Sequence, residues 1–533
     1  MHYNLATHNT CSTYNLIFLK LSSYRLLLNC SLFFKQFGRN FSKFLNLAFL
    51  SRPMVLVLTV VVLLSISFAN HALTAQTTNI IYGNAPYLTF DGGRTRVKNT
   101  EALLGISLSD GRTFTPTTNN SSSTNPIVLP VAGQSFNDIG MFIPTNTDSV
   151  ELTSVIGPPN NYWGDDDGDG DGQDPDGITA TGSLNLSIID RFNNPVTRNT
   201  VLTICNGPYK VKLASTNGTL STRYGVPKGS DFNASNATYY INPKAPPEVC
   251  FAKPNLQYGT LLGRSDFRGP ATMWNEKMGF ITQSKNPSSY DLNFPTTGAH
   301  NLYFDLDIGG NYRELSWQPV SHGGITATMT EATNKSVRVS LTGPFAKDEQ
   351  LGSSNPSSLG TILNPTLPQT FELVGRDSQS GEEVVKYGFK LKQWFVNRGL
   401  KSYTNESVSS WCSDIGYRMP KVKDLTNAIC AGANSGSNGN ICKGVVGATP
   451  SSTGNHYQRR IGAGFFSEWG DLRGNTDAGF NYGYWTSDPG RDSNYNNFVV
   501  FAYAGYASSV FIANGSKTDT HIGVCAAAPL KDD

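Results

Sequence analysis

Short segments in which apolar and polar residues alternate run through the middle of this 533-residue sequence. The clearest is 302–308, where every second residue is a large apolar one, and the segments 184–188 and 337–341 repeat the pattern. A period of two residues is typical of a strand with one buried face. Because no helical stripe of comparable strength appears here, region 76–346 predicts β-sandwich-like modules.

The composition supports this interpretation and excludes some partners. Charged residues make up 15% of the chain, against roughly 25% in an average soluble domain. The sequence has 52 Gly and 28 Pro, which suit short strands joined by many turns. A net charge of +2 provides no basic surface for a nucleic acid, so no nucleic-acid partner is expected.

One long apolar run, 55–69, lies near the N-terminus. It is shorter than the roughly 20 residues that cross a bilayer as a helix. Lys43 and Arg52 precede it and small residues follow, so we interpret 1–75 as a leader with a secretory signal peptide. An uncleaved membrane anchor is the alternative, and Met54 could be the start in place of Met1.

Six cysteines follow this leader. An even number behind a secretion signal favours disulfides over metal or catalytic thiols, and no C-x-x-C pair occurs among them. Six cysteines allow 15 connectivities. Their spacing favours the pairs Cys205–Cys250, Cys430–Cys442 and Cys412–Cys525.

The segment 347–371 is rich in turn formers and poor in apolar residues, which predicts a linker between domains. Beyond it, 372–533 predicts a second, α+β domain. The expected elements are a strand at 384–396, short helices at 406–415 and 421–429, and strands within 484–524.

This C-terminal region carries an ordered set of motifs. They are Trp411-Cys412, Gly416-Tyr417-Arg418-Met419-Pro420, Asp424-Leu425, Tyr484-Trp485-Thr486-Ser487, Gly505 and Val524-Cys525. The set resembles the C-type-lectin-like fold at the tips of the intimin and invasin adhesins of enteric bacteria. This resemblance implies a disulfide between Cys412 and Cys525. The calcium-ligating tripeptides of sugar-binding lectins do not occur between these cysteines, so calcium-dependent sugar binding is not expected in this domain.

Region 76–345 is similar, less specifically, to an adhesion-associated domain of enterobacterial surface proteins. The strings that suggest it are Tyr82-Gly83-Asn84-Ala85-Pro86 and Tyr162-Trp163-Gly164-Asp165. The resemblance implies a mainly β N-terminal region followed by a C-type-lectin-like domain. It also implies an extracellular or cell-surface location, with outer-membrane association through another component.

An acidic loop follows in 165–176. If Asp165 is position 1 of a 12-residue calcium loop, Asp167 and Asp169 occupy positions 3 and 5, a glycine occupies position 6, and Asp171 and Asp176 occupy positions 7 and 12. Oxygen ligands at this spacing are typical of Ca²⁺ sites. The flanking residues are strand-like, so the loop lies outside an EF-hand, and a solvated acidic turn is the alternative.

Catalysis is poorly supported, and we do not expect an enzyme. The sequence has no G-x-S-x-G, H-E-x-x-H or phosphate-binding loop. The favoured function is an adhesin that binds a host protein or glycan through the C-terminal domain. The alternatives are a structural or assembly component of the envelope and, more remotely, a secreted hydrolase.

The long insertion 431–483 in the C-terminal domain is the expected receptor-binding segment. It is rich in Gly, Ser and Asn, and among them stand the residue types that dominate interface energies. These candidates are Tyr457, Arg459, Arg460, Trp469 and Arg473.

The acidic loop yields a first prediction. If it binds Ca²⁺, the ion stabilises the protein by about 2.7 kcal/mol at a hundredfold excess over its dissociation constant. Replacing Asp167 and Asp169 together by Ala should abolish the calcium-dependent rise in melting temperature. A wild-type melting curve that chelator leaves unchanged would identify the loop as an acidic turn.

Overall fold

The computed structural model describes residues 84–166, 178–223, 226–311, 313–437, 441–492, 494–511 and 519–527. The chain divides into two units, Met1–Ile80 and Ile81–Asp533, and all described residues belong to the second. The predicted signal peptide lies outside them. Within these ranges, no helix combines the length and apolar character that a membrane span requires.

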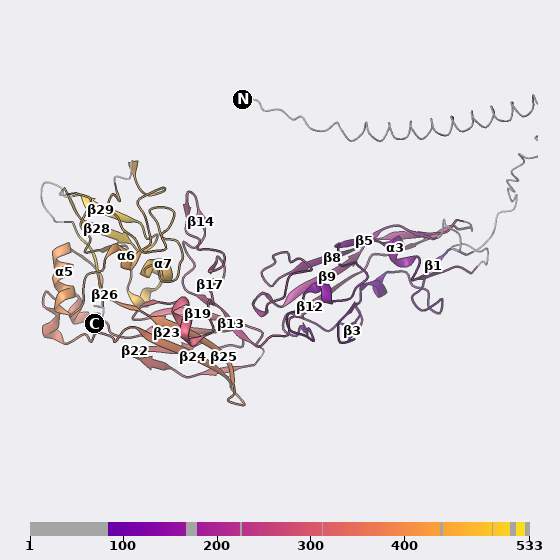
Figure 1. The fold of residues 1–533 in the computed structure, drawn as a ribbon, viewed down its shortest axis with the longest axis horizontal. Helices are drawn as coiled ribbons and strands as arrows, with labels where there is room; N and C mark the ends of the chain where they lie inside the picture. The colour runs from indigo at the N-terminus through magenta and orange to yellow at the C-terminus, as the bar shows by residue number, and fades with distance from the viewer. Residues whose placement is uncertain are drawn as a thin grey trace, which may run out of the picture. The chain divides into compact units, whose positions relative to one another are not determined.

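Residues 87–242 fold around their own hydrophobic core. Its strands are β1 (Tyr87–Leu88), β2 (Ile106–Ser107), β3 (Thr113–Phe114), β4 (Ile127–Val128), β5 (Ser149–Glu151), β6 (Trp163–Gly164), β7 (Thr179–Ala180), β8 (Ser183–Ile189), β9 (Tyr209–Ser215), β10 (Gly218–Ser221), β11 (Gly229–Phe232) and β12 (Asn236–Asn242). Its short helices are η2 (Glu101–Leu104), η3 (Phe136–Asp138), α3 (Leu152–Ile156) and η4 (Ile204–Asn206). The main sheet has the order β4-β12-β9-β8-β5, and a second sheet has the order β11-β10-β7. Figure 1 labels β12, β9, β8 and β5 of the main sheet.

A sandwich of two further sheets follows. Its strands are β13 (Glu248–Lys253), β14 (Leu261–Leu262), β15 (Ser265–Asp266), β16 (Trp274–Asn275), β17 (Gly279–Ile281), β19 (Leu302–Gly309), β20 (Leu315–Trp317), β21 (Val320–His322), β22 (Ile325–Thr330), β23 (Ser336–Thr342), β24 (Gln369–Asp377) and β25 (Glu383–Leu391). A sheet of order β16-β17-β13-β19-β23-β22-β21 faces a sheet of order β20-β24-β25. Phe304 of β19 meets Tyr387 and Phe389 of β25 between them. β14 and β15 form a separate hairpin.

The C-terminal sheet has the order β18-β26-β30-β27-β28-β29. Its strands are β18 (Thr297–Ala299), β26 (Gln393–Tyr403), β27 (Gly483–Trp485), β28 (Tyr495–Phe501), β29 (Ala507–Phe511) and β30 (His521–Ala526). The helices of the second half of the chain are η5 (Pro287–Leu292), α4 (Asp348–Leu351), η6 (Pro356–Leu359), α5 (Asn405–Asp414), α6 (Val422–Leu425), α7 (Phe465–Trp469), η8 (Leu472–Gly474) and η9 (Thr476–Ala478). This part is α+β, as expected for a C-type-lectin-like fold.

The strongest sequence patterns are confirmed. The alternating segments 184–188, 302–308 and 337–341 form β8, β19 and β23, and their apolar residues are buried. The helix predicted at 406–415 is α5, whose first turn is capped by the Thr404 hydroxyl accepting from the amide of Ser407 at 3.3 Å.

Two predicted elements differ in extent from the structure. The segment 384–396 is extended as predicted but forms two strands: it covers β25 except for its first residue, and the first four residues of β26, and Lys392 between them donates its backbone amide to Thr296 at 2.7 Å. The helix predicted at 421–429 is reduced to α6. It ends there because Thr426 turns to extended backbone and its hydroxyl donates to the carbonyl of Gly505 at 2.7 Å.

The structure also differs from the predicted boundary at 347–371. This segment contains α4, η6 and the start of β24, and Gln350 and Ile362 within it are buried. β24 and β25, which the prediction placed in the lectin-like domain of 372–533, pair with β20 of the sandwich. The turn-forming residues of 347–371 belong to loops, but these loops do not separate two domains. One hydrophobic core contains residues from Val249 to Ala527, on both sides of the segment.

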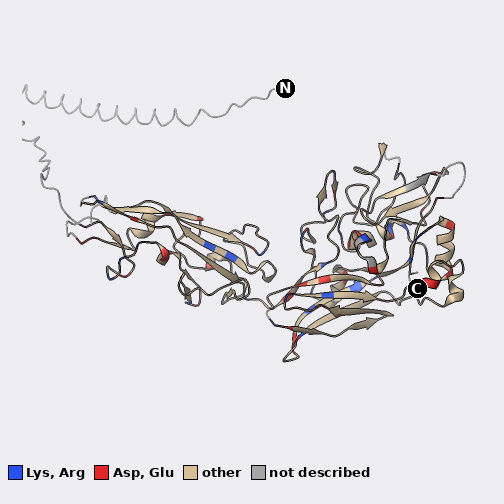
Figure 2. Ribbon diagram, turned by 180° about the vertical axis from the view of Figure 1, so that it is seen from behind, with Lys and Arg blue, Asp and Glu red and all other residues tan. Residues whose placement is uncertain are grey.

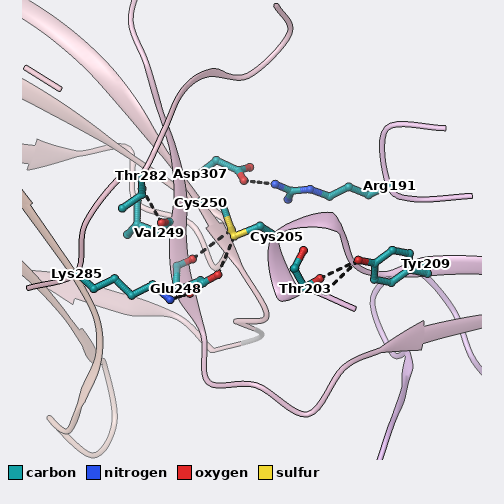
Figure 3. Close-up of a disulfide and its surroundings, with 10 residues drawn as sticks. All are labelled: Arg191, Thr203, Cys205, Tyr209, Glu248, Val249, Cys250, Thr282, Lys285 and Asp307. Carbon is teal, nitrogen blue, oxygen red and sulfur yellow. Dashed lines mark hydrogen bonds and ion pairs between the residues drawn. A yellow bond between two sulfur atoms is a disulfide. The ribbon is translucent and has the colours of Figure 1, made fainter. Parts of the chain in front are cut away.

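All three expected disulfides are present. Cys205 in η4 is bonded to Cys250 in β13, with their Cα atoms 5.4 Å apart, and this links the first core to the second. Figure 3 shows the neighbouring ion pair, in which Arg191 donates to Asp307 at 2.5 Å. Cys412–Cys525 joins α5 to β30, and Cys430–Cys442 closes a short loop.

A buried carboxylate fixes α7 to the edge of the C-terminal sheet. Glu468 has no exposed surface. Its oxygens accept hydrogen bonds from the backbone amides and hydroxyls of Thr296 and Thr297 and from the amide of Gly462, at distances of 2.6 to 3.1 Å. A carboxylate is acceptor-only and satisfies all these donors, which a glutamine cannot do.

Glu468→Gln should therefore destabilise the protein by about 3 kcal/mol, because at least one buried N–H group loses its acceptor. Chemical denaturation of the full chain measures the effect. Glu349→Gln, at an exposed position in α4, is the control and should change the free energy of unfolding little. Equal effects of the two substitutions would contradict this account of Glu468.

Candidate functional site

Three of the five residues predicted to bind a receptor are buried. Tyr457 and Arg459 have no exposed surface, and Trp469 is 1% exposed. The Arg459 guanidinium lies over the ring of Trp274 at 4.3 Å and donates to the carbonyl of Asn255 at 2.8 Å. The prediction was wrong for these residues because the insertion is poor in aliphatic side chains, so its aromatic residues and the stem of Arg459 supply its core.

The other two predicted residues, Arg460 and Arg473, are half-buried. Arg473 lies beside a group of aromatic rings on the surface. The buried carboxylate of Asp471 accepts from its Nε at 2.9 Å and from its Nη2 at 2.7 Å. These hydrogen bonds raise the pKa of Arg473 and hold its guanidinium in one place.

The aromatic group, here called the tyrosine cluster, consists of Tyr258, Tyr482, Phe501, Tyr503 and Tyr506. Tyr503 is its centre, with ring centroids 5.8 Å from Tyr258, 5.9 Å from Tyr482 and 5.6 Å from Tyr506. Phe501 and Tyr506 stack at 4.4 Å. The Arg473 guanidinium lies 4.6 Å from the Tyr503 ring, a cation–π distance.

The cluster is exposed enough to bind a partner. Tyr482 is 56% exposed, and the other four rings are half-buried. The Tyr503 hydroxyl donates to that of Tyr506 at 2.8 Å, and burial raises the pKa of Tyr503. The Tyr503 phenol is therefore neutral at physiological pH, and its hydrogen bond to Tyr506 holds the two rings in place.

The turn between β28 and β29 positions the cluster. These two strands pair and lie beside each other in Figure 1. Gly505 has φ of +64°, and its amide donates to Phe501 at 2.7 Å. A Cβ atom there would collide with the ring of Tyr457 and lie 2.9 Å from the Thr426 hydroxyl. The Tyr457 hydroxyl also donates a hydrogen bond to the carbonyl of Tyr503 at 3.2 Å, so this buried side chain supports the cluster from the core side.

Sequence reasoning missed this site except for Arg473. The expected strands of 484–524 included Phe501, Tyr503 and Tyr506. Two tyrosines on either side of Gly505, a residue typical of turns, could have indicated an aromatic surface here. Tyr258, however, lies more than 200 positions from these residues along the chain, and only the fold brings it there.

The acidic loop is described only at its start. Asp165 is half-buried, whereas Asp167, Asp169, Asp171 and Asp176 lie outside the described residues. The neighbouring Asp166 accepts from the Tyr87 hydroxyl at 2.9 Å and forms an ion pair with Arg96. Calcium binding stays a prediction.

Groups that could serve catalysis or hold a metal have structural partners. His300, His322, His456 and His521 each pack against a different aromatic ring. Asp305 and Asp307 form ion pairs with Arg338 and Arg191. In the described part of the chain, the cysteine and carboxylate donors that come close together are Cys205, Glu248 and Cys250, and their sulfurs are joined in a disulfide.

Comparison with known proteins points to bacterial adhesins. Over 172 residues the chain is 28% identical to the inverse autotransporter adhesin YeeJ of Escherichia coli (strain K12). This alignment covers 31% of this chain and 6% of that adhesin. The structure of invasin, a bacterial integrin-binding protein, matches 66% of this chain and 50% of its own, with 12% identity and a TM-score of 0.29. The chain is similar to these adhesins.

A further structural match is the C-terminal 282-residue fragment of intimin in complex with the intimin-binding domain of the translocated intimin receptor, Tir. It covers 62% of this chain and 97% of the fragment, with 9% identity and a TM-score of 0.27. No protein-family model matches the chain. The expected resemblance to intimin and invasin is thus found, at low identity, and the chain spans only a small part of the length of its curated relative.

Gly505→Ala tests how the turn supports the cluster. An alanine at this position would have an unfavourable positive φ and its Cβ would collide with Tyr457. The free energy of unfolding should therefore fall by about 3 kcal/mol. Gly462→Ala is the matched control, because Gly462 has φ of +75° and no atom within 4 Å of an added Cβ. It should cost only about 1 kcal/mol. Equal losses in denaturation experiments would show that contact with Tyr457 does not matter.

Proposed function

We propose that this protein is an exported bacterial adhesin that binds a host cell-surface protein through the tyrosine cluster of its C-terminal part. The similarity to adhesins supports the general function. The three disulfides fit an oxidising, extracellular location.

The observation that carries the proposal is the exposed tyrosine cluster beside a fixed arginine. Tyr and Arg are the side chains most enriched among residues that dominate protein–protein binding energies. Tyrosine contributes a large amphipathic area and loses little conformational entropy, since it has only two side-chain torsions. Arg473 is already immobilised by Asp471, so a partner would meet a preorganised surface.

Binding by this surface does not require calcium. Along the sequence the acidic loop falls within the region of the first core, 87–242, whereas Tyr258, Phe501, Tyr503 and Tyr506 of the tyrosine cluster pack against the second core. Tyr503 interacts with neighbouring aromatic rings, with the Arg473 guanidinium and with the Tyr506 hydroxyl. Recognition therefore rests on aromatic area and hydrogen bonding.

Tyr482→Ala and Tyr503→Ala test the proposal. Each should weaken binding of the full-length protein to host cells by about thirtyfold, the loss of roughly 2 kcal/mol expected at an interface anchor. The measurement is a titration of labelled protein on cultured animal cells, followed by flow cytometry. Because Tyr482 is 56% exposed, its replacement should leave the melting temperature almost unchanged.

The matched control is Tyr240→Ala, at a half-buried tyrosine of β12 in the first core, which should bind like wild type. Chelator should not reduce binding. Undiminished binding by both cluster variants would place the receptor site elsewhere, and binding lost in chelator would assign it to a metal-dependent surface.

A further inference from the structure

A cleft of about 280 Å³ lies beside β18, the edge strand of the C-terminal sheet. Its lining comes from four segments, which are 299–301 at the end of β18, 345–351 with α4, 395–399 in β26 and 477–480 at the end of η9. No member of the tyrosine cluster is among the described residues that line it. The cleft is therefore a separate candidate surface for a partner.

Two stacked rings stand at this cleft. The rings of His300 and Phe345 lie nearly parallel, with centroids 4.0 Å apart and an angle of 8° between their planes. Although His300 stacks on it, Phe345 remains 48% exposed, so much of its ring is open to a partner. The amide of Gly343 donates to His300 Nδ1 at 3.3 Å, and burial lowers the pKa of His300. The stacked pair is therefore uncharged at physiological pH.

The charged side chains that line the cleft are acidic. They are Asp348 in α4 and Asp477 in η9, and both residues are exposed. Neither carboxylate forms an ion pair with a residue that the structure describes. The described lining contains no Lys or Arg. The cleft therefore presents two uncompensated negative charges.

A buried oxygen atom in the cleft wall adds to this negative potential. Asn397 of β26 lines the cleft, and its amide nitrogen donates to the carbonyls of Ala478 and Gly479. Because both partners are acceptors, they identify which end of the amide is the nitrogen. The Asn397 Oδ1 atom is buried and has no hydrogen-bond partner among the described residues. Its partial negative charge is therefore uncompensated and favours a cation in the cleft.

A guanidinium group matches this combination of aromatic and acidic groups. It is planar, stacks on aromatic faces, stays charged at every physiological pH and carries five N–H donors that suit carboxylate oxygens. A lysine ammonium is more strongly hydrated and is not planar, so it gains less from a stacked ring. The cleft therefore favours arginine over lysine.

We propose that this cleft binds an arginine side chain of a partner protein. The guanidinium stacks on Phe345 and pairs with the carboxylates of Asp348 and Asp477. The charge of the cleft is complementary to this occupant, and the exposed ring and carboxylates are accessible to it. Because the cleft and the tyrosine cluster have no described residue in common, either proposal can fail without the other.

Binding of blocked amino acids to the full-length protein tests this proposal. The probe is N-acetylarginine N-methylamide, measured by ligand-observed NMR titration. The matched comparison is the citrulline analogue, which keeps the planar shape of the side chain but has no charge. The arginine probe should bind in the millimolar range, and the citrulline analogue should bind at least about tenfold more weakly. The lysine analogue should also bind more weakly than the arginine probe.

Substitutions at the cleft provide an independent report. Asp348→Asn together with Asp477→Asn should lower the affinity for the arginine probe about tenfold, and Phe345→Ala should also weaken binding. All three positions are exposed, so melting curves should show that the variants remain folded. Glu349→Gln is the matched control, because it removes a carboxylate from the next position of α4 without altering the lining of the cleft. It should bind like wild type.

Four results would overturn the proposal. They are no binding of the arginine probe up to about 10 mM, equal affinity for the citrulline analogue, full affinity in the double Asn variant, and equal losses in the double Asn variant and Glu349→Gln. Binding of the lysine analogue as tightly as the arginine probe would overturn the assignment to arginine, since it would make the cleft a site for cations in general.

Discussion

The parallel pairing of β18 with β26 is the contact on which the C-terminal half of the molecule depends. Thr297, Gly298 and Ala299 pair with the first residues of β26, so a segment that precedes β19 of the sandwich forms the edge of the C-terminal sheet. Trp394 fills the space beside this pairing. A Cβ on Gly298 would lie 2.9 Å from its ring, and a Cβ on Gly343 would lie 2.6 Å from it. Because only glycine permits this approach, the sandwich and the C-terminal sheet share one close-packed core.

This shared core explains how a long insertion rich in Gly, Ser and Asn becomes ordered. Such a segment has few aliphatic side chains, so buried polar groups replace them. The Asn455 amide donates to Asn434 at 2.8 Å and to Ala507 at 2.9 Å, and its oxygen accepts from the amide of Ala507 at 2.9 Å. Glu468 has the same role against Thr296 and Thr297. Fully satisfied polar networks of this kind specify one arrangement of the chain.

The same network gives the tyrosine cluster its rigidity. Asn455 holds the start of β29, which follows the turn that carries Tyr503 and Tyr506. α7 packs Trp469 into the core, where its indole N–H donates to the carbonyl of Thr297, and Glu468 fixes the helix against the same segment. Charged residues are sparse over the part of the ribbon that the structure describes (Figure 2). Recognition by such a surface depends on aromatic area and specific hydrogen bonds more than on long-range electrostatic attraction.

The sequence alone determined the class of fold, the three disulfides and the strongest strands. The apolar alternation of 302–308 specifies β19, since a period of two residues puts every apolar side chain on one face. Spacing separated Cys205 and Cys250 from the other four cysteines, and the resemblance to the C-type-lectin-like fold supported Cys412–Cys525. Sequence could not determine the boundary at 347–371, because turn formers mark loops within a shared core as well as linkers between domains.

Only the tertiary structure decided which residues of the insertion are available to a partner. Tyr457, Arg459 and Trp469 have the residue types of binding sites, yet they are buried. The surface was instead formed by residues distant along the chain, such as Tyr258 and Tyr503. The physical reason is that aromatic and arginine side chains serve equally well as core and as interface. Their role is fixed by what packs over them, and this depends on contacts between segments far apart in the sequence.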